Sequence, residues 1–183
     1  AARPHANPLK IGLGEGEVAF NPFVKLTSDG ITLIVPHVDI GQGVQSSQAA
    51  LIAEELDIDV EQATLSFGEP NAAYYNTAFA EEGVPFMSFD DGSVAETMRG
   101  VMGGVVKLLG IQGTGGSTSM PDQYEKLRMA GAVARETIKA AASQRTGLPV
   151  AQLKTAKGEV VLPDGTTIAY IDLAAEAAEI PAV

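Results

Sequence analysis

ITLIVPHVDIGQGVQSSQAALIAEEL, residues 31–56, is the stretch that decides the fold. An apolar strand runs into Gly41-Gln42-Gly43 and continues directly into an amphipathic helix. A glycine turn at a helix start presents unpaired backbone N–H groups and the positive end of the helix dipole to whatever lies above it. The stretch therefore predicts an anion-binding turn between a strand and a helix.

The composition is that of a one-domain globular protein. The chain has 183 residues, of which 45% are hydrophobic, and this is enough to bury an apolar core. Its net charge of −11 argues against nucleic acid and anionic lipid as partners. No apolar run reaches the roughly 18 residues of a membrane span. Without cysteine the chain cannot itself hold an iron–sulfur cluster, and two histidines do not make an ordinary structural zinc site.

Turn signals divide the rest of the chain. Asp-Gly turns at 29–30 and 164–165 separate β-rich runs and predict hairpins over 23–35 and 159–170. Proline, glycine, asparagine and aspartate interrupt every period in residues 68–92. That segment is expected to form a long loop, and long loops within compact domains are usually functional or disordered.

Apolar stripes at helical spacing predict three long helices, near residues 43–56, 93–109 and 121–146. Ser119 is expected to cap the last of these, and a short alanine-rich helix is expected at 172–178. Glycines within the second helix are expected to permit close helix packing.

The expected fold class is α+β. A hairpin-containing mixed sheet, with strands near 23–27, 31–38 and 64–67, is expected to pack against two or three long helices. Residues 1–20, punctuated by glycine and proline, are expected to form an extended arm, and residues 21–183 the folded domain.

A second glycine segment, GTGGSTS at 113–119, lies directly before the longest predicted helix. Its glycine N–H groups and neighbouring hydroxyls suit a phosphate or the rim of a polar heterocycle. A flexible linker with a serine cap explains the same residues. Two glycine turns that each open a helix indicate a binding site more strongly than either turn alone, and we expect the two to converge on one groove.

A dinucleotide-binding fold is an alternative interpretation of Gly41-Gln42-Gly43, because the motif follows a strand. The third glycine of that fingerprint is Ser46 here. The acidic residues about twenty positions later, Asp59 and Glu61, precede the next strand instead of ending it. Both features count against this alternative.

Six short segments follow one another in the order seen in a known family. They are NPFVKL (21–26), VDIGQGV (38–44), AEEL (53–56), VEQAT (60–64), TGGSTS (114–119) and LRMAGAVAR (127–135). The series resembles the large subunit of the xanthine dehydrogenase and aldehyde oxidase molybdenum hydroxylases. It resembles more closely the branch with the isoquinoline 1-oxidoreductase β subunit and related bacterial aldehyde dehydrogenases. The resemblance covers about residues 20–178.

The resemblance implies a molybdopterin-binding type of domain, with molybdopterin cytosine dinucleotide and its molybdenum held by both glycine segments. Such enzymes oxidise aldehydes or N-heterocycles with water-derived oxygen and pass the electrons to iron–sulfur clusters. Because this chain has no cysteine, a partner subunit must carry those clusters. The implied cofactor-binding residues are Gly41, Gln42, Gly43, Gly115, Gly116, Ser117, Thr118 and Ser119.

The departures from the family are also informative. Its catalytic glutamate lies near the end of a much longer subunit, and Glu69 is superficially similar but falls at the wrong place in the motif order. No catalytic or metal-ligating residue is therefore assigned, and the chain alone is expected to be inactive. It is expected to be a fragment or split subunit that joins the remainder of the large subunit and an iron–sulfur subunit. The resemblance also implies a cytochrome as a candidate electron acceptor, and the periplasm or the periplasmic face of the inner membrane as the location.

A non-catalytic α+β interaction module is the alternative function. Residues 50–100 contain eleven acidic side chains and a single basic one, Arg99. This pattern is typical of a solvated face, and it also suits docking of a basic partner.

Overall fold

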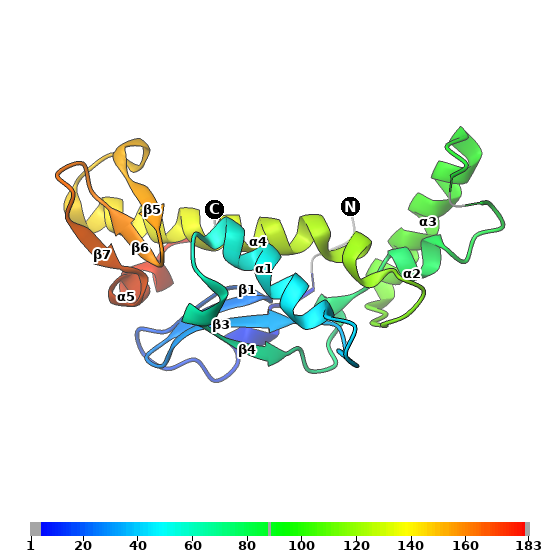
Figure 1. Ribbon diagram of the computed structural model, residues 1–183, viewed down its shortest axis with the longest axis horizontal. Coiled ribbons are helices and arrows are strands. Elements are labelled where there is room, and N and C mark those ends of the chain that lie inside the picture. The colour runs from blue at the N-terminus through cyan, green and yellow to red at the C-terminus, as the bar shows by residue number, and fades with distance from the viewer. Residues whose placement is uncertain (1–4, 88, 182–183) are drawn as a thin grey trace.

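Two β-sheets and a long helix that contacts both organise the chain (Figure 1). The computed structural model describes residues 5–87 and 89–181. The strands are β1 (Val18–Asn21), β2 (Val24–Thr27), β3 (Gly30–Val35), β4 (Ala63–Phe67), β5 (Lys154–Ala156), β6 (Glu159–Val161) and β7 (Thr167–Ala169). The α-helices are α1 (Val44–Leu56), α2 (Ala78–Glu81), α3 (Ser93–Leu109), α4 (Ser119–Thr146) and α5 (Ala174–Ala178). The 3₁₀ helices are η1 (Pro8–Lys10), η2 (Val60–Gln62), η3 (Ala72–Tyr74), η4 (Val150–Gln152) and η5 (Tyr170–Leu173).

The larger sheet has the strand order β1-β2-β3-β4. The first three strands are antiparallel, and the β2–β3 turn is the predicted hairpin with Thr27 opposite Gly30. β3 and β4 are parallel, so a crossover must join them, and α1 lies in that connection. β3 ends at Val35 instead of reaching residue 38, since Pro36 has no N–H to donate to a neighbouring strand. The predicted α+β fold with these strands in one mixed sheet is confirmed.

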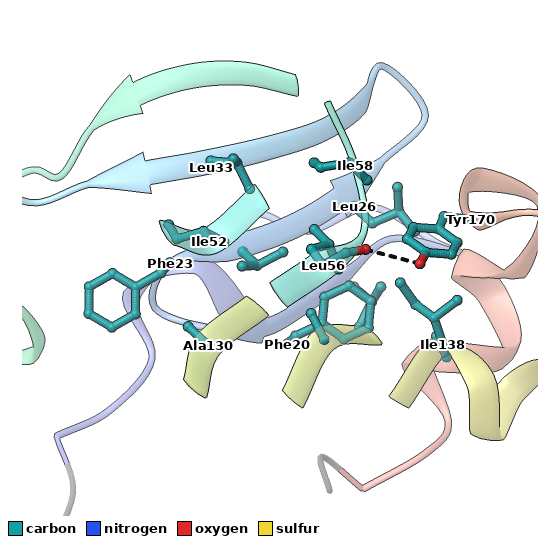
Figure 2. Packing of buried hydrophobic residues seen from close by; sticks show 14 of the residues in the cluster. Phe20, Phe23, Leu26, Leu33, Ile52, Leu56, Ile58, Ala130, Ile138 and Tyr170 are labelled. Carbon is teal, nitrogen blue, oxygen red and sulfur yellow. Dashed lines mark hydrogen bonds between the residues drawn. The ribbon is translucent and has the colours of Figure 1, made fainter. Parts of the chain in front are cut away.

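α1 and α4 pack side by side against the larger sheet (Figure 1). Gly131 allows the two helices to approach closely, because a Cβ atom there would lie 2.3 Å from the carbonyl oxygen of Ile52. Apolar side chains from the strands and both helices fill the core, as Figure 2 shows for Leu33, Leu56 and Ile138. The stripe predicted on α1 is the side that is buried.

The smaller sheet has the order β5-β6-β7. Its β6–β7 pair is the predicted second hairpin. β5 has no counterpart among the sequence predictions, because its three residues carry no apolar alternation that would mark a strand. The hydroxyl of Tyr170, just after β7, donates to the carbonyl oxygen of Leu56 over 3.0 Å and ties this sheet to α1 (Figure 2).

The end of the predicted arm, residues 1–20, lies within the sheet. Val18 to Phe20 belong to strand β1, pair with β2 and are buried. These three side chains are apolar and follow the last arm glycine, Gly16, so they fill the core instead of extending into solvent. The folded part of the chain therefore begins before residue 21.

Residues 68–112 contain more helix than expected. α3 matches the helix predicted at 93–109, whereas η3 and α2 lie within the segment predicted to be a loop. Gly103 packs closely on α2, because a Cβ there would meet the Glu81 carboxylate at 2.5 Å. α2 has four residues, too few for a periodic pattern to reveal it. Among the helices that the structure describes, none is both long and apolar enough to cross a membrane.

Candidate functional site

The two glycine segments lie together at one end of the α1–α4 pair. Two hollows of about 810 Å³ and about 440 Å³ share Ile40, Gln42 and Thr114 as lining residues. The N–H of Val38 donates to the Thr114 hydroxyl over 3.2 Å, although 76 positions separate them. We call the combined hollow the loop groove. The prediction that both segments converge on one groove at two helix starts is confirmed in part, because Gln42 lines the groove whereas Gly41 and Gly43 are not among its lining residues.

The first segment, Gly41-Gln42-Gly43, is a closed turn. Gly41 and Gly43 have φ of 97° and 79°, values that favour glycine. The Gln42 amide is used within the loop, since its oxygen accepts from the Ile40 N–H at 2.6 Å and its nitrogen donates to the Val38 carbonyl at 2.9 Å. Gln42 therefore holds the shape of the turn.

The start of α1 already has an anion, the carboxylate of Asp39. It accepts from the N–H of Gly41 at 2.7 Å and from that of Gln45 at 2.9 Å. These N–H groups, Gln45 first, hold the pKa of Asp39 below its usual value. The expectation that this turn presents its N–H groups to an external anion is wrong for these two groups, because the chain supplies the capping carboxylate itself.

The second segment is open. Gly116 and Ser117 are consecutive left-handed residues, with φ of 60° and 59°. Within the part of the chain that the structure describes, the backbone N–H groups of Gly115, Gly116 and Ser117 make no hydrogen bond. The side of the segment lies against α2, since a Cβ on Gly116 would meet the Glu82 carboxylate at 2.8 Å.

Ser119 does not cap α4, contrary to the prediction. Thr118 is the N-cap residue and Ser119 the first helical residue. The Thr118 hydroxyl is fully buried, donates to the carbonyl oxygen of Gly115 at 2.7 Å and accepts from the Asn76 amide at 2.9 Å. Of the five predicted residues of this segment, Gly115, Ser117 and Ser119 line the loop groove, whereas Thr118 lies beneath it. Gly116 lies between two of the lining residues.

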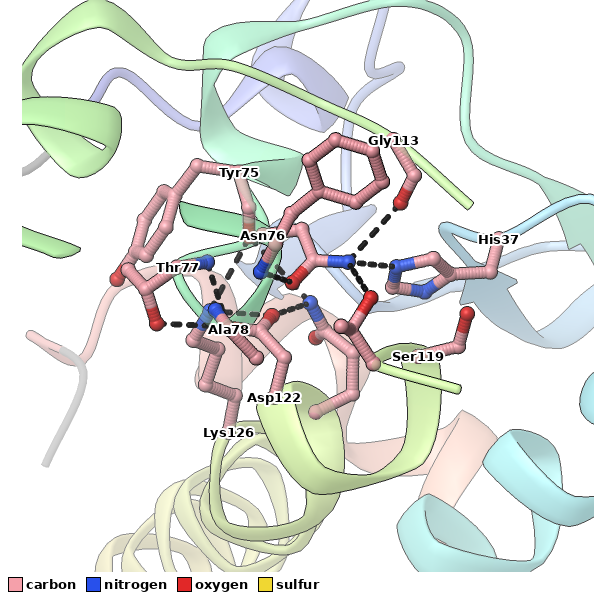
Figure 3. A network of polar contacts seen from close by, with 12 residues as sticks. His37, Tyr75, Asn76, Thr77, Ala78, Gly113, Ser119, Asp122 and Lys126 are labelled. Carbon is pink, nitrogen blue, oxygen red and sulfur yellow. Dashed lines mark hydrogen bonds and ion pairs between the residues drawn. The ribbon is translucent and has the colours of Figure 1, made fainter. Parts of the chain in front are cut away.

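A buried polar network beneath the groove joins the second segment to His37, to α1 and to the residues before α2 (Figure 3). The Asn76 amide donates to the carbonyl oxygen of Gly113 at 3.0 Å and to the Thr118 hydroxyl. The Gln48 amide nitrogen lies 2.8 Å from His37 Nδ1 and donates to the carbonyl oxygen of Ser119 at 3.3 Å. Side chains from before α1, from α1 and from before α2 thus fix the backbone of the second segment.

Asp122, in the first turn of α4, is the charged centre of this network (Figure 3). Its carboxylate accepts from the N–H and the hydroxyl of Thr77 at 2.7 and 2.8 Å. The Lys126 ammonium group donates to the same carboxylate at 2.7 Å and lies 4.0 Å from the ring centre of Tyr75. This ion pair, in which the carboxylate is buried and the Lys126 side chain is 24% exposed, attaches residues 75–78 to the start of α4.

His37 is 1% exposed and lies between the two amides of the network. Burial lowers its pKa, because the imidazolium form loses hydration there, while the nearby Asp122 carboxylate opposes that effect. The side chain is therefore a neutral imidazole at neutral pH, and its Nδ1 is paired with the Gln48 amide.

None of His37, Gln48 and Asn76 is among the residues predicted from the sequence. Gln48 carries a signal that could have identified it, because it lies four positions from both Val44 and Ile52 on the buried stripe of α1. A polar side chain on a buried stripe requires a partner. Asn76 carries no comparable signal, since it lies in the segment predicted to be a loop.

The loop groove would bind a ligand through hydrogen bonds and not through side-chain cations. Neither hollow is lined by a lysine or arginine among the described residues, and Asp39 lies on the rim. Peptide N–H groups and the hydroxyls of Thr114 and Ser117 are its donors. In the described residues no group of three or more histidine, aspartate or glutamate side chains is placed to hold a metal ion. The groove can grip a polar heterocycle or a diphosphate through the backbone of its second segment.

Curated proteins with similar sequences include two oxidoreductase subunits. The chain is 28% identical over 145 residues to the beta subunit of isoquinoline 1-oxidoreductase from Brevundimonas diminuta, covering 79% of this chain and 15% of that protein. It is 25% identical over 175 residues to the B subunit of nicotinate dehydrogenase from Pseudomonas putida, covering 93% of this chain and 12% of that protein. No family model matches the chain.

The first of these relatives comes from the branch that the ordered sequence motifs indicate. This likeness agrees with the resemblance of the motif series to the molybdenum hydroxylases. It spans less than a sixth of the length of either relative. Among solved structures, the crystal structure of quinoline 2-oxidoreductase from Pseudomonas putida 86 matches 83% of this chain and 15% of that chain, with 15% identity and a TM-score of 0.46.

Proposed function

We propose that this chain is the molybdopterin-dinucleotide-binding part of a molybdenum hydroxylase that oxidises aldehydes or N-heterocycles with water-derived oxygen. The observation that carries the proposal is the convergence of the two glycine segments on one groove. The same two segments belong to the motif series that resembles the family, and similarity to the two oxidoreductase subunits supports the assignment.

The second segment would hold the charged part of the cofactor. Gly115, Gly116 and Ser117 offer three neighbouring N–H groups, and Thr114 and Ser117 add hydroxyls. Such a cluster of peptide donors binds phosphate oxygens without needing a side-chain cation. When bound, the cofactor supplies the two-electron redox chemistry. The chain's own residues bind and orient it.

The first segment would contact an uncharged part of the cofactor, and its conformation is fixed before the cofactor binds. The side chains of Asp39 and Gln42 already accept hydrogen bonds from backbone N–H groups of this turn. The turn therefore has a fixed conformation, with the Asp39 carboxylate at its edge, and does not offer these N–H groups to a ligand. Gly41 is open on its outer side, with nothing within 4 Å of where a Cβ would lie. A planar ring can therefore approach the backbone at Gly41.

The remaining assignments follow from this proposal. The cofactor is molybdopterin cytosine dinucleotide, and the chain acts with the remainder of the large subunit and with an iron–sulfur subunit. A cytochrome is the proposed electron acceptor, and the periplasm or the periplasmic face of the inner membrane is the proposed location. The chain alone has no turnover, since the loop groove provides too few contacts to immobilise a dinucleotide tightly.

A chimera tests the proposal. This chain replaces the matching segment of the isoquinoline 1-oxidoreductase β subunit, and the purified chimera is analysed for molybdenum content and pterin fluorescence. Circular dichroism and assembly with the small subunit report folding. We expect molybdenum to be retained and to fall in Ser117→Ala, while Ser28→Ala in the β2–β3 turn leaves it unchanged. A folded, assembled chimera without molybdenum contradicts the proposal and favours the interaction module.

A further inference from the structure

Helix α3 carries a large apolar surface that faces solvent. It projects away from the sheets at the end of the molecule that holds α2 (Figure 1). Seven of its large apolar side chains are between 39% and 66% exposed. They are Val94, Met98, Val101, Met102, Val105, Leu108 and Leu109. A protein of this size rarely exposes so many apolar side chains on one element without a partner for them.

These side chains follow the spacing of a coiled-coil seam. Val94, Met98, Val101, Val105 and Leu108 are separated by four, three, four and three residues, which is the spacing of core positions in a heptad repeat. At about 100° per residue, all seven apolar side chains fall within an arc of about 120°. We call this arc the α3 seam. Its shape is that of a surface built to receive another helix.

The rest of the chain contacts the other side of α3. Ala95, Gly103 and Val106 are its buried residues, and they lie beyond the edge of the seam on the side that faces α2. Arg99 is also on that side, where it donates to the carbonyl oxygens of Met87 and Asp90 at 2.7 and 2.6 Å. The described residues therefore contact α3 on the side that faces α2, and they leave the α3 seam exposed to solvent.

The seam contains no charged residue. On the helical wheel Glu96 and Lys107 lie opposite it, while Thr97 and Gly104 border it and allow a second helix to come close. Seven such side chains on each of two copies would bury about 1,000 Å² in total, the lower limit for a specific interface. A second copy therefore offers both the matching spacing and sufficient area.

We propose that α3 pairs with α3 of a second copy of this chain, antiparallel, with Val101 near the two-fold axis. The antiparallel arrangement brings Val94 of each copy towards Leu108 of the other, and it opposes the two helix dipoles favourably. This pairing does not depend on the proposed cofactor, because the seam and the loop groove share no residue.

Sedimentation equilibrium of the full chain tests this pairing. A reversible dimer is expected, and it becomes tighter as salt is added, because each copy carries a net charge of −11 whose repulsion salt screens. Met98→Glu in the seam is expected to give a monomer, whereas Met129→Glu, at an exposed position of α4, remains a dimer. Circular dichroism confirms that both variants fold.

Disulfide cross-linking sets the orientation, because the chain has no native cysteine. Val101→Cys is expected to form covalent dimers on oxidation, and Val94→Cys is not, since only a parallel pair would place two copies of residue 94 together. A chain that is monomeric at every soluble concentration, with or without salt, overturns the proposal and leaves the seam to a helix of another protein. A dimer that persists in folded Met98→Glu overturns it as well.

Discussion

Both glycine segments contribute residues to the loop groove, yet their backbone N–H groups differ: those of Gly41 and Gln45 are hydrogen-bonded, whereas those of Gly115, Gly116 and Ser117 have no hydrogen bond among the described residues. Around Gly41 and Gly43, the Asp39 carboxylate and the Gln42 amide take up local donors and acceptors. Around Gly116, three consecutive N–H groups have no partner among the described residues, and Ser117 has a left-handed backbone. The first segment is stabilised by hydrogen bonds among its own neighbouring residues. The second is fixed by the buried network beneath it, and its N–H groups remain free to bind a ligand.

This difference suits the two segments to different roles: the first keeps a fixed conformation, and the second keeps hydrogen-bond donors for a ligand. A turn that caps itself keeps its conformation without a ligand but has fewer donors to offer one. An open turn retains its donors only if something else fixes its backbone, and here Asn76, Thr118 and Asp122 do so. The second segment should therefore depend on its supporting network, and the first on Asp39 and Gln42.

The largest expected effect comes from Asp122→Ala. Removing the carboxylate leaves the N–H and hydroxyl of Thr77 without their acceptor, while the Lys126 ammonium keeps only the Tyr75 carbonyl oxygen. The free energy of unfolding is expected to fall by about 2 kcal/mol, since buried donors lose their hydrogen-bond acceptor. Urea unfolding measures the change, with the exposed Asp91→Ala as control. A loss no greater than that of the control would show that the network does not support the second segment.

The next effect is a pH dependence that originates at His37. Its pKa in the folded chain lies below the ordinary 6.5, so below that pH the unfolded chain binds more protons. The contribution of His37 to the free energy of unfolding is fully present above pH 6.5. As the pH falls below 6.5 it decreases by at most about 1.4 kcal/mol per pH unit. Below the pKa of the folded state it no longer changes. Unfolding measured across this range should be steeper for the natural chain than for His37→Gln. Equal slopes would contradict the buried neutral imidazole.

A smaller loss is expected for Asp39→Ala, which opens the first segment. The variant frees the N–H groups of Gly41 and Gln45, and water replaces the carboxylate because the turn is exposed. The melting temperature is expected to drop less than in Asp122→Ala. Amide hydrogen exchange should quicken at Gly41 and Gln45 and stay unchanged at Ser117. Unchanged exchange at Gly41 would show that Asp39 is not its cap.

The smallest effect is a gain, from Ser117→Gly. Ser117 has a φ of 59°, which costs a residue with a side chain about 1 kcal/mol. Glycine removes that strain but loses more chain entropy on folding, so a net stabilisation of about 0.5 kcal/mol is expected. Ser28→Gly, where φ is not positive, should destabilise instead. Both changes can be measured by urea unfolding.

The sequence predicts the parts of this molecule whose period or turn chemistry is local. The Asp-Gly hairpins, the stripes of α1 and α4 and the glycine segments all carry such signals, and their elements form as expected. α2 and β5 are too short to show a period. The buried network could not be predicted, because His37, Asn76 and Asp122 meet only through tertiary packing.

On the proposed function, the contrast between the segments assigns ligand binding to the second one. Amide NMR of the full chain, titrated with cytidine diphosphate and separately with pyrophosphate, tests this assignment most directly. We expect the chemical-shift changes to be concentrated at Gly115, Gly116 and Ser117. The amides of Gly41 and Gln45 should be unaffected, because their N–H groups already donate to the Asp39 carboxylate. Changes at Gly41 and Gln45 instead, or no change in either segment, would show that the second segment is not the binding element.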